Sequence, residues 1–588
     1  LEHEAAAPTG SERRLVTWSH LFDWVAHYIE AFQRHTVAVM PPEEMLLLRG
    51  FLGVLATVVR YSPATRDALF SHKAYAPLER LFALYACAVP MDLKAALLRA
   101  MAAFATQTGT GASPRILSAL WDNLDQSGAI RSVRGEPPRA LYELEHIECV
   151  HGRYPGTHAL VSFLSAILPH VAPVSNAATL VAHMQDTLSL TAPMLASRKS
   201  SAHAVSYVTF VLDHVLLPAS TRTYVRPAER WSLSAACLEF AEQCLATLPV
   251  APLDSTHPGF DVLRRLLSGT PFLQEIFFFV HPDPSCAGYE VINFNMAQTP
   301  DYVRVVRAAL RILLHVLDLQ NDVLHVLPLT HDAALKDRAL FLPLDAHLLH
   351  AHQIVVQVAL YVHCVDAEAA WLAVRLLRAL ARTSTFQATD AFGPLRARTS
   401  CNRLVGLLDM TGETSRVISG VLAWLEADSD DGEDAGASPA KIQRELLDLF
   451  LDQLAPDAPA PNVAHLLLGF DMNAPESDRL VQGSRDALLH TLAKRVTPPS
   501  TWTPALAERC YAVLHRACLH PYTSASMLRF LRMHDFCAVQ LRALPLTPMT
   551  VPDQGTLVYG ATGEAISTSP EWALALLHTH AHMLSLVA

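Results

Sequence analysis

The first strong pattern of hydrophobic positions predicts an amphipathic helix close to the start of the chain. The apolar positions of this segment, each three or four residues from the next, are Leu15, Trp18, Phe22, Val25, Ile29 and Phe32. Because an α-helix turns once in 3.6 residues, this spacing places all six side chains along one stripe of its surface. The pattern therefore indicates a helix that packs along one face.

Further amphipathic runs follow at short intervals, and proline marks where many of them begin. Between residues 43 and 126 the predicted helices are 43–60, 63–71, 76–88, 91–105 and 113–125. A hydroxyl residue can cap the first turn, and proline is tolerated at the first helical position because its missing N–H would have no partner there. Such pairs are Ser62-Pro63, Ser113-Pro114, Thr270-Pro271, Ser438-Pro439, Thr503-Pro504 and Ser569-Pro570.

Many consecutive helices joined by short connections predict an all-α fold. Neighbouring helices then pack antiparallel, and a series of such pairs stacks into a solenoid because no pair buries its faces alone. We expect a HEAT/armadillo-like superhelix of degenerate repeats, with about 40–47 residues per helix pair. Residues 281–294 and 551–563 are the exceptions, and we expect long loops or short strands there.

Composition and charge agree with this fold class. The chain has 588 residues, 51% of them hydrophobic, whereas a single compact core rarely grows past about 300 residues. Glycine accounts for only 23 residues, which favours helix over a turn-rich β-protein. The net charge of −11 argues against a nucleic-acid-binding protein, which would show a basic face.

One acidic stretch divides the expected solenoid. Residues 426–434 are dense in aspartate and glutamate, which predicts a disordered surface loop, with a tail for a basic partner as the alternative. We therefore expect a disordered tail over 1–12, an α-solenoid over 13–427, an acidic disordered loop over 428–437 and a solenoid continuation over 438–588. No stretch is long and apolar enough to predict a transmembrane segment. The chain starts without methionine and ends within a helical pattern, so we expect a piece of a longer protein.

Candidate catalytic and metal-binding patterns are incomplete. The glycine spacing of 555–562 is that of a phosphate loop, but Ala561 stands where a lysine must reach the phosphates. His578 and His582 share a helix face near His580, yet no third ligand or general-base glutamate accompanies them. The ten cysteines form no CxxC pair.

An acidic cluster in the first third of the chain has the layout of an ordinary helix surface. Glu145 and Glu148 would lie on one face, and Leu144 and Ile147 on another, with Glu143 and His146 close by. A catalytic carboxylate would need partners from elsewhere to raise its pKa, and the sequence identifies none. We therefore predict no catalytic, cofactor-binding or metal-binding residues, no cofactor and no enzymatic activity.

The densest aromatic segment contains the one candidate partner-binding residue. Phe272, Ile276 and Phe279 recur at helical spacing, so core packing is the favoured interpretation of this segment. Phe278 points away from that stripe and is the candidate anchor for a partner.

A run in the first third of the chain resembles a known family. The residues Leu141-Tyr142-Glu143-Leu144-Glu145-His146-Ile147-Glu148 are followed by Tyr154-Pro155-Gly156-Thr157-His158-Ala159. They are similar to the larger karyopherin-like scaffold nucleoporins of the nuclear pore inner ring, in which an ELExIE run leads into YPxTxA. Other blocks similar to this family keep their order from about residue 18 to 545. Gly156, where the family usually has a larger apolar residue, and the acidic insertion at 428–434 depart from the pattern and leave the smaller sibling family open.

The resemblance implies a structural role at the nuclear envelope. It implies a HEAT/armadillo-type scaffold of the nuclear pore complex in the nucleus, which binds short segments of linker nucleoporins and supports transport of protein and mRNA. It implies no catalytic residues and no direct contact with nucleic acid. A soluble karyopherin-type transport receptor is the alternative within the same fold class, and a helical-repeat enzyme is the alternative outside it.

Overall fold

The computed structural model describes most of the chain, in sixteen segments. The described residues are 17–34, 40–105, 113–130, 138–168, 206–249, 257–282, 288–295, 300–326, 341–392, 399–428, 437–470, 487–497, 502–543, 557–559, 565–567 and 570–587. The chain divides into two compact units, Leu1–Arg265 and Leu266–Ala588. The expected tail over 1–12 and most of the acidic loop, 429–436, lie outside the described residues.

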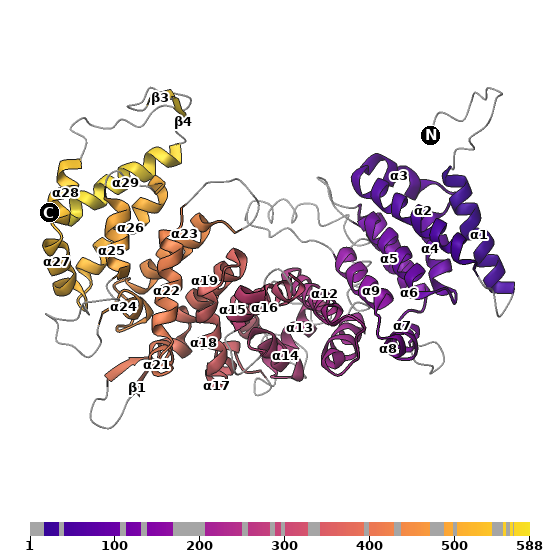
Figure 1. Ribbon diagram of the computed structural model, residues 1–588, viewed down its shortest axis with the longest axis horizontal. Coiled ribbons are helices and arrows are strands. Elements are labelled where there is room, and N and C mark those ends of the chain that lie inside the picture. Colours follow the sequence, from indigo (N-terminus) through magenta and orange to yellow (C-terminus); the bar gives the residue numbers. More distant parts are fainter. Residues whose placement is uncertain are drawn as a thin grey trace. The chain divides into compact units, whose positions relative to one another are not determined.

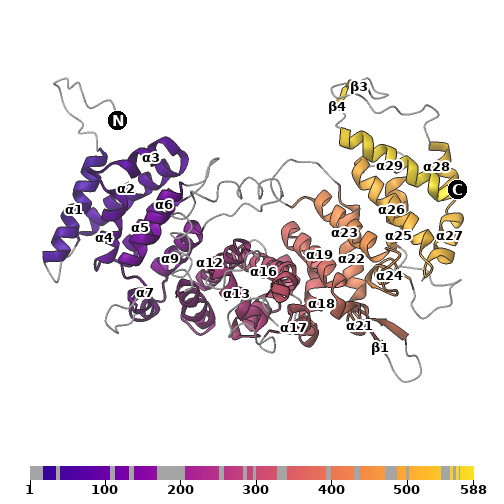
Figure 2. The ribbon, with the colours of Figure 1, turned by 180° about the vertical axis from the view of Figure 1, so that it is seen from behind.

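The first unit consists of helices in two rows (Figures 1 and 2). In one row α2 contacts α5, α5 contacts α9 and α9 contacts α12; in the other, α1 contacts α4 and α4 contacts α6. The helices of this unit are α1 (Trp18–Arg34), α2 (Pro42–Tyr61), α3 (Pro63–Ser71), α4 (Pro77–Ala86), α5 (Met91–Ala105), α6 (Pro114–Gln126), α7 (Arg139–Glu143), the π-helix η1 (Leu144–Glu148), α8 (Cys149–His151), α9 (Pro155–Ile167), the π-helix η2 (Phe210–Leu216), the 3₁₀ helix η3 (Leu217–Ser220), α12 (Pro227–Ala246) and most of α13 (Pro258–Leu267).

The second unit repeats the two-row arrangement. One row runs α16, α19, α23, α26, α29 and the other α14, α18, α22, α25, with each helix in contact with the next in its row. The helices are α14 (Pro271–Val280), α15 (Gly288–Asn295), α16 (Pro300–Val326), α17 (Leu344–His350), α18 (His352–Leu360), the 3₁₀ helix η7 (Tyr361–His363), α19 (Ala367–Arg382), α20 (Ser384–Gln387), α21 (Arg403–Met410), α22 (Thr414–Glu426), α23 (Pro439–Gln453), α24 (Val463–Leu467), α25 (Ala487–Val496), α26 (Pro504–Leu519), α27 (Ser524–Met533), α28 (Phe536–Ala543) and α29 (Pro570–Val587).

Strands are short in the described part of the chain. They form two antiparallel hairpins, β1 (Thr389–Phe392) with β2 (Thr399–Asn402) and β3 (Leu557–Tyr559) with β4 (Ala565–Ser567). The strand β3 falls in the segment 551–563, where short strands or a loop were expected. Paired rows of helices are the architecture of helical-repeat proteins, so the all-α, solenoid-type fold class is confirmed.

Proline sets the first residue of many helices. In all six hydroxyl–proline pairs a helix begins at the proline. Two of the hydroxyl residues also cap their helix, because the Oγ atoms of Ser62 and Ser438 accept hydrogen bonds from the backbone N–H groups of Thr65 and Lys441, respectively. The restricted φ of proline already has a helical value, and its absent N–H leaves no donor unpaired. The five helices predicted between residues 43 and 126 are found within two residues of the expected ends.

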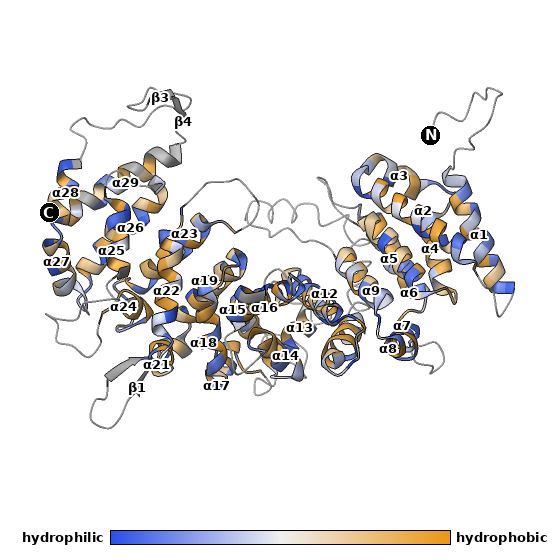
Figure 3. Cartoon of the chain, in the orientation of Figure 1, coloured by the Kyte–Doolittle hydropathy of each residue, from blue (hydrophilic) through white to orange (hydrophobic). Residues whose placement is uncertain are grey.

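The hydrophobic core of each unit consists of the buried apolar side chains of its packed helices. Helices combine apolar and polar stretches along their length (Figure 3). In α5, at the centre of its row, Leu93, Leu97, Leu98, Met101 and Phe104 are fully buried. Buried alanines between them let α2 and α9 approach α5 from both sides.

The expectation for residues 281–294 is wrong in its second half. Residues 288–295 form α15, although asparagine and β-branched residues there favour helix only weakly. Tertiary contacts outweigh that propensity, because Tyr289 and Ile292 are buried and the Gly288 N–H donates to Oε1 of Gln357 over 3.0 Å. A Cβ atom on Gly288 would lie 2.3 Å from the Tyr361 hydroxyl, so glycine permits this close approach.

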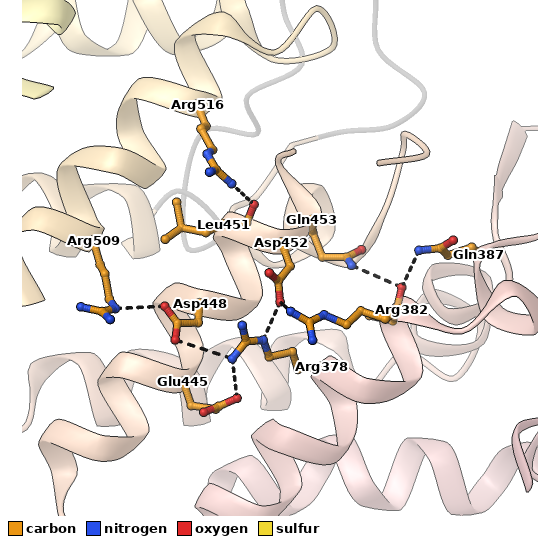
Figure 4. Close-up of polar contacts among 11 residues, drawn as sticks. Arg378, Arg382, Gln387, Glu445, Asp448, Leu451, Asp452, Gln453, Arg509 and Arg516 are labelled. Carbon is orange, nitrogen blue, oxygen red and sulfur yellow. Dashed lines mark hydrogen bonds and ion pairs between the residues drawn. The ribbon is translucent and has the colours of Figure 1, made fainter. Parts of the chain in front are cut away.

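Ion pairs connect successive helices of one row in the second unit (Figure 4). The carboxylates of α23 involved are Glu445, Asp448 and Asp452, which follow one another at helical spacing on one face. Arg378 of α19 approaches all three, and Arg509 of α26 donates to Asp448 over 3.0 Å from the other side. The acidic face of α23 is therefore held between arginines of both neighbours.

Candidate partner-binding surface

Phe278 stands apart from its aromatic neighbours on α14. Phe272, Ile276 and Phe279 are buried, with at most 1% of each exposed, so they form the expected core stripe. Phe278 is 37% exposed and meets the Phe279 ring edge to face, with 6.0 Å between ring centres. Its exposure is compatible with a partner-facing role, which stays a prediction.

The acidic cluster differs from the expected polar face. Glu145 is exposed, but Glu143 and Glu148 are buried, because residues 144–148 form a π-helix whose wider turn breaks the 3.6-residue register. Glu143 pairs with Lys94 of α5, and its carboxylate also lies 3.5 Å from Nε of Arg139. The prediction that Glu148 belongs to a polar surface face is therefore wrong.

Glu148 closes the connection between η1 and α9. Its carboxylate accepts from the backbone N–H of Gly156 over 2.7 Å and of Thr157 over 3.1 Å, and also from the Thr157 hydroxyl. Burial raises the pKa of Glu148 to about 7, although these hydrogen bonds act to lower it. The cavity beside Lys94, Glu143 and Thr157 measures about 10 Å³, so it has no room for a substrate. This cluster joins α5, η1 and α9 and is structural.

The histidines His578 and His582 of α29 contact different side chains. Nδ1 of His578 lies 2.9 Å from a carboxylate oxygen of Glu508, whereas His582 faces the ring of His515. Within the described segments, no three histidine, cysteine, aspartate or glutamate side chains are grouped to hold a metal ion. The glycines of the loop at 555–562 and Ala561 lie outside the described residues.

The buried cysteines lack the environment of reactive thiols. Cys237, Cys244, Cys364 and Cys510 are buried, and burial raises the pKa of each thiol. A thiol with a raised pKa carries little thiolate, the nucleophilic form, at neutral pH. These residues act as small apolar core side chains.

A groove lies between α2 and α5 in the first unit. It has a volume of about 480 Å³ and exposes mainly apolar surface. Its lining residues are Leu46, Arg49, Gly50, Gly53, Ala56, Thr57, Arg60 and Tyr61 of α2 with Ala96 and Arg99 of α5.

Two stripes on α2 explain why the groove exists. Leu48, Leu52, Leu55 and Val59 recur at helical spacing and are fully or almost fully buried. A second stripe with the same spacing, Leu46, Gly50, Gly53, Thr57 and Tyr61, faces outward. Leu46 is 65% and Tyr61 71% exposed, so two large side chains border a floor of small ones.

Three arginines give the groove its charge. Arg49, Arg60 and Arg99 contribute to its lining, and none of the lining residues is acidic. Among the described residues, no carboxylate lies within ion-pair distance of Arg49 or Arg99. The groove therefore combines an apolar floor with a cationic border.

The sequence already contained a signal for this groove. The helix over 43–60 was predicted, and its second stripe has the same three- and four-residue spacing as the buried one. Two glycines inside a helix cost about 1 kcal/mol each relative to alanine, so their presence on one stripe indicates a packing or binding role. The predicted bounds of this helix carried no assignment of its faces.

Helix length and hydropathy indicate whether a helix could span a membrane. Within the described residues, no single helix is long and apolar enough to cross a bilayer. The pair α2 and α3 meets the length and composition criteria together, but the two helices are bent by 116° at their junction.

Comparisons with a family model and with individual proteins indicate the same family. Residues 1–588 match the model of the family described as Nup192, nuclear pore complex scaffold, nucleoporins 186/192/205. The chain is 24% identical over 606 aligned residues to human nuclear pore complex protein Nup205, an alignment that covers 90% of this chain and 27% of that protein. It is 22% identical to Arabidopsis thaliana NUP205 over 80% of this chain and 23% of that protein.

A shorter alignment points the same way. The chain is 24% identical over 293 residues to Drosophila melanogaster Nup205, which covers 45% of this chain and 13% of that protein. The chain thus spans about a quarter, or less, of the length of the curated relatives it matches.

Proposed function

The chain belongs to the Nup192 family of nuclear pore complex scaffold nucleoporins, and from that premise we propose that it is a segment of an inner-ring scaffold that binds linker nucleoporins. In this role it holds short segments of flexible partners and supports nucleocytoplasmic transport from the nuclear envelope. The family match over the whole chain supports the scaffold role. The linker segments and the inner-ring position are part of the proposal.

The observation that carries the proposal is the two-row stack of helices. In a stack of this kind one face of each row remains available, and neighbouring helices form grooves in which a short peptide can lie. The space between α2 and α5 is one such groove, and the partly exposed ring of Phe278 is a second apolar feature that a peptide could contact. A few apolar anchors then supply most of the binding free energy.

Calorimetric titration of the chain with segments of linker nucleoporins tests the proposal. We expect at least one segment to bind, with modest dependence on salt because apolar anchors dominate. The Phe278→Ala variant reports whether Phe278 is one of the anchors. If no segment binds at high micromolar concentration, this part of the protein spaces binding sites located elsewhere.

We also propose that the chain catalyses no reaction and holds no cofactor. The two buried carboxylates of the acidic cluster, Glu143 and Glu148, are engaged by Lys94 and Thr157 in contacts between helices. We expect no stoichiometric metal and no ATP binding in the purified chain. Retention of one zinc ion per chain after treatment with a chelator would contradict this.

The alternative of a soluble karyopherin-type receptor has no observation in its favour. Such a receptor would need an acidic surface for basic cargo signals, whereas the α2–α5 groove carries three arginines. Affinity capture from a nuclear-envelope extract separates the two roles, since a scaffold should recover other nucleoporins and a receptor should recover cargo.

A further inference from the structure

We propose that the α2–α5 groove binds one helix of a partner protein, a helix with leucine and alanine on one face and glutamate or aspartate beside that face. The inference rests on the proposed function, because it names the kind of segment that one surface of this scaffold takes. It is argued from the shape of the groove, its length and its charge.

The floor of the groove is shaped for close approach of another helix. A Cβ atom built on Gly50 or Gly53 would meet nothing within 4 Å, so the space above the floor is open. Ala56 and Ala96 add only methyl groups to the lining. Small residues on a helix face let a second helix backbone come near, which increases van der Waals contact along its whole length.

The length of the groove suits a helix of about four turns. Leu46 and Tyr61 are fifteen positions apart on α2, which corresponds to about 22 Å at 1.5 Å per residue. Both side chains are mostly exposed and stand at the ends of the small-residue floor. They can therefore pack against apolar side chains near the two ends of a bound helix.

The charge of the groove selects an acidic partner. Arg49, Arg60 and Arg99 line the same groove without an acidic residue among them, although the whole chain has a net charge of −11. Arginine binds carboxylates through paired hydrogen bonds, and opposite charges across an interface favour one partner over another. Carboxylates on both sides of the apolar face of a helix would reach these guanidinium groups.

A concave groove favours a peptide over a membrane surface. Binding in the plane of a bilayer requires apolar side chains that protrude from a polar surface. Here the centre of the exposed stripe is formed by Gly50 and Gly53, which have no side chain to insert. A convex helix fills such a hollow, and we therefore assign the groove to a peptide.

The test uses two synthetic peptides of about 16 residues, the length that spans the groove. Both carry leucine and alanine at the same i, i+3, i+4 and i+7 positions with glutamine elsewhere, and they differ only in glutamates or lysines beside that face. Calorimetric titration into the full chain should show binding of the glutamate peptide, and at least about tenfold weaker binding of the lysine peptide.

A matched pair of variants locates the binding site. Leu46 lines the groove, whereas Leu47, its neighbour on the same helix, does not, and both are more than half exposed. We expect Leu46→Glu to weaken the glutamate peptide by about tenfold or more and Leu47→Glu to change its affinity by less than about twofold. Gly53→Phe fills the floor and should also abolish binding. Its thermal unfolding should match that of the unaltered chain because the site is open.

Each other outcome contradicts the inference in a distinct way. Equal binding of both peptides would refute the role of the arginines, and binding that survives Gly53→Phe would place the site elsewhere. Binding of anionic lipid vesicles that Leu46→Glu abolishes, without peptide binding, would assign the groove to a membrane. Self-association abolished by Gly53→Phe would assign it to a second copy of the chain.

The linker nucleoporin segments separate this inference from the proposed function. If they bind Gly53→Phe as well as the unaltered chain, the scaffold role stands and this groove is not their site. If they fail to bind the unaltered chain while the glutamate peptide binds the groove, the proposed partner is wrong and the groove assignment stands.

Discussion

At the scale of single residues, Phe278 and Phe279 are chemically identical neighbours in different environments. Phe279 is fully buried, and its truncation to alanine should lower the free energy of unfolding by about 3–5 kcal/mol. Phe278 is 37% exposed, so Phe278→Ala should cost clearly less, about 1–2 kcal/mol. Thermal unfolding of the two variants, each compared with the unaltered chain, measures the difference. Equal losses would show that both rings are core.

A second prediction at this scale concerns how the protonation of Glu148 affects the stability of the chain. Its pKa of about 7 in the folded chain lies above the ordinary value of 4.5, so the folded chain binds this proton more tightly than the unfolded chain. The contribution of Glu148 to stability is therefore greatest below pH 4.5 and is lost as the pH rises through 7.

The variant Glu148→Gln tests this because its side chain stays neutral at every pH. We expect the melting temperature of the unaltered chain, relative to that of the variant, to be higher at about pH 5 than at about pH 8. Glu145→Gln on the same π-helix is exposed and serves as the control. A difference that is constant or grows with pH would contradict the raised pKa.

These residues also show how far the sequence predicts single sites. The exposure of Phe278 followed from a 3.6-residue pattern, which holds because α14 is a regular helix. The burial of Glu148 could not follow from that pattern, because η1 is a π-helix and because Thr157 meets it only after the chain turns. The local pattern of apolar and polar residues indicates neither the change from α-helix to π-helix nor the contact with Thr157.

At the scale of helices, the arginines between α19 and α23 should differ in importance. Arg378 contacts three carboxylates with its side chain 20% exposed, whereas Arg382 pairs with Asp452 and is 56% exposed. Arg378→Met leaves carboxylates facing one another in a half-buried position, and we expect a loss of about 2 kcal/mol. Arg382→Met should cost less than about 1 kcal/mol. Chemical unfolding of both variants checks the order, and a larger loss for Arg382→Met would contradict it.

Helix boundaries were predictable where proline marks them. Ser62-Pro63 and Ser438-Pro439 each combine a side-chain cap with a residue that fits the first helical position, so two local causes agree. The helix α15 was not predicted because the contacts that stabilise it come from distant parts of the chain. Its residues have weak helix propensity, and the contacts of Tyr289 and Gly288 with other helices hold it in place.

At the scale of the whole molecule, the sequence indicated a stack of helix pairs but not which helices share a row. The helix α5 packs between α2 and α9. This arrangement depends on how the buried side chains of α5, small ones such as Ala100 and large ones such as Leu97, fit those of the neighbouring helices. The degenerate repeats contain no motif that marks this order. For the same reason the groove beside Gly53 could be located only once α2 and α5 were known to be neighbours.

The row arrangement also predicts how a local defect spreads. The helices α2, α5 and α9, like α16, α19, α23, α26 and α29, contact mainly their neighbours in the row, so stability should be a sum of nearest-neighbour terms rather than one cooperative total. Leu98 of α5 is fully buried, and Leu98→Ala should remove about 2–5 kcal/mol locally. Hydrogen exchange should then accelerate in α2, α5 and α9 and stay unchanged in α23, α26 and α29 of the second unit. Equal acceleration in all six helices would mean that both units unfold together and that the nearest-neighbour description is wrong.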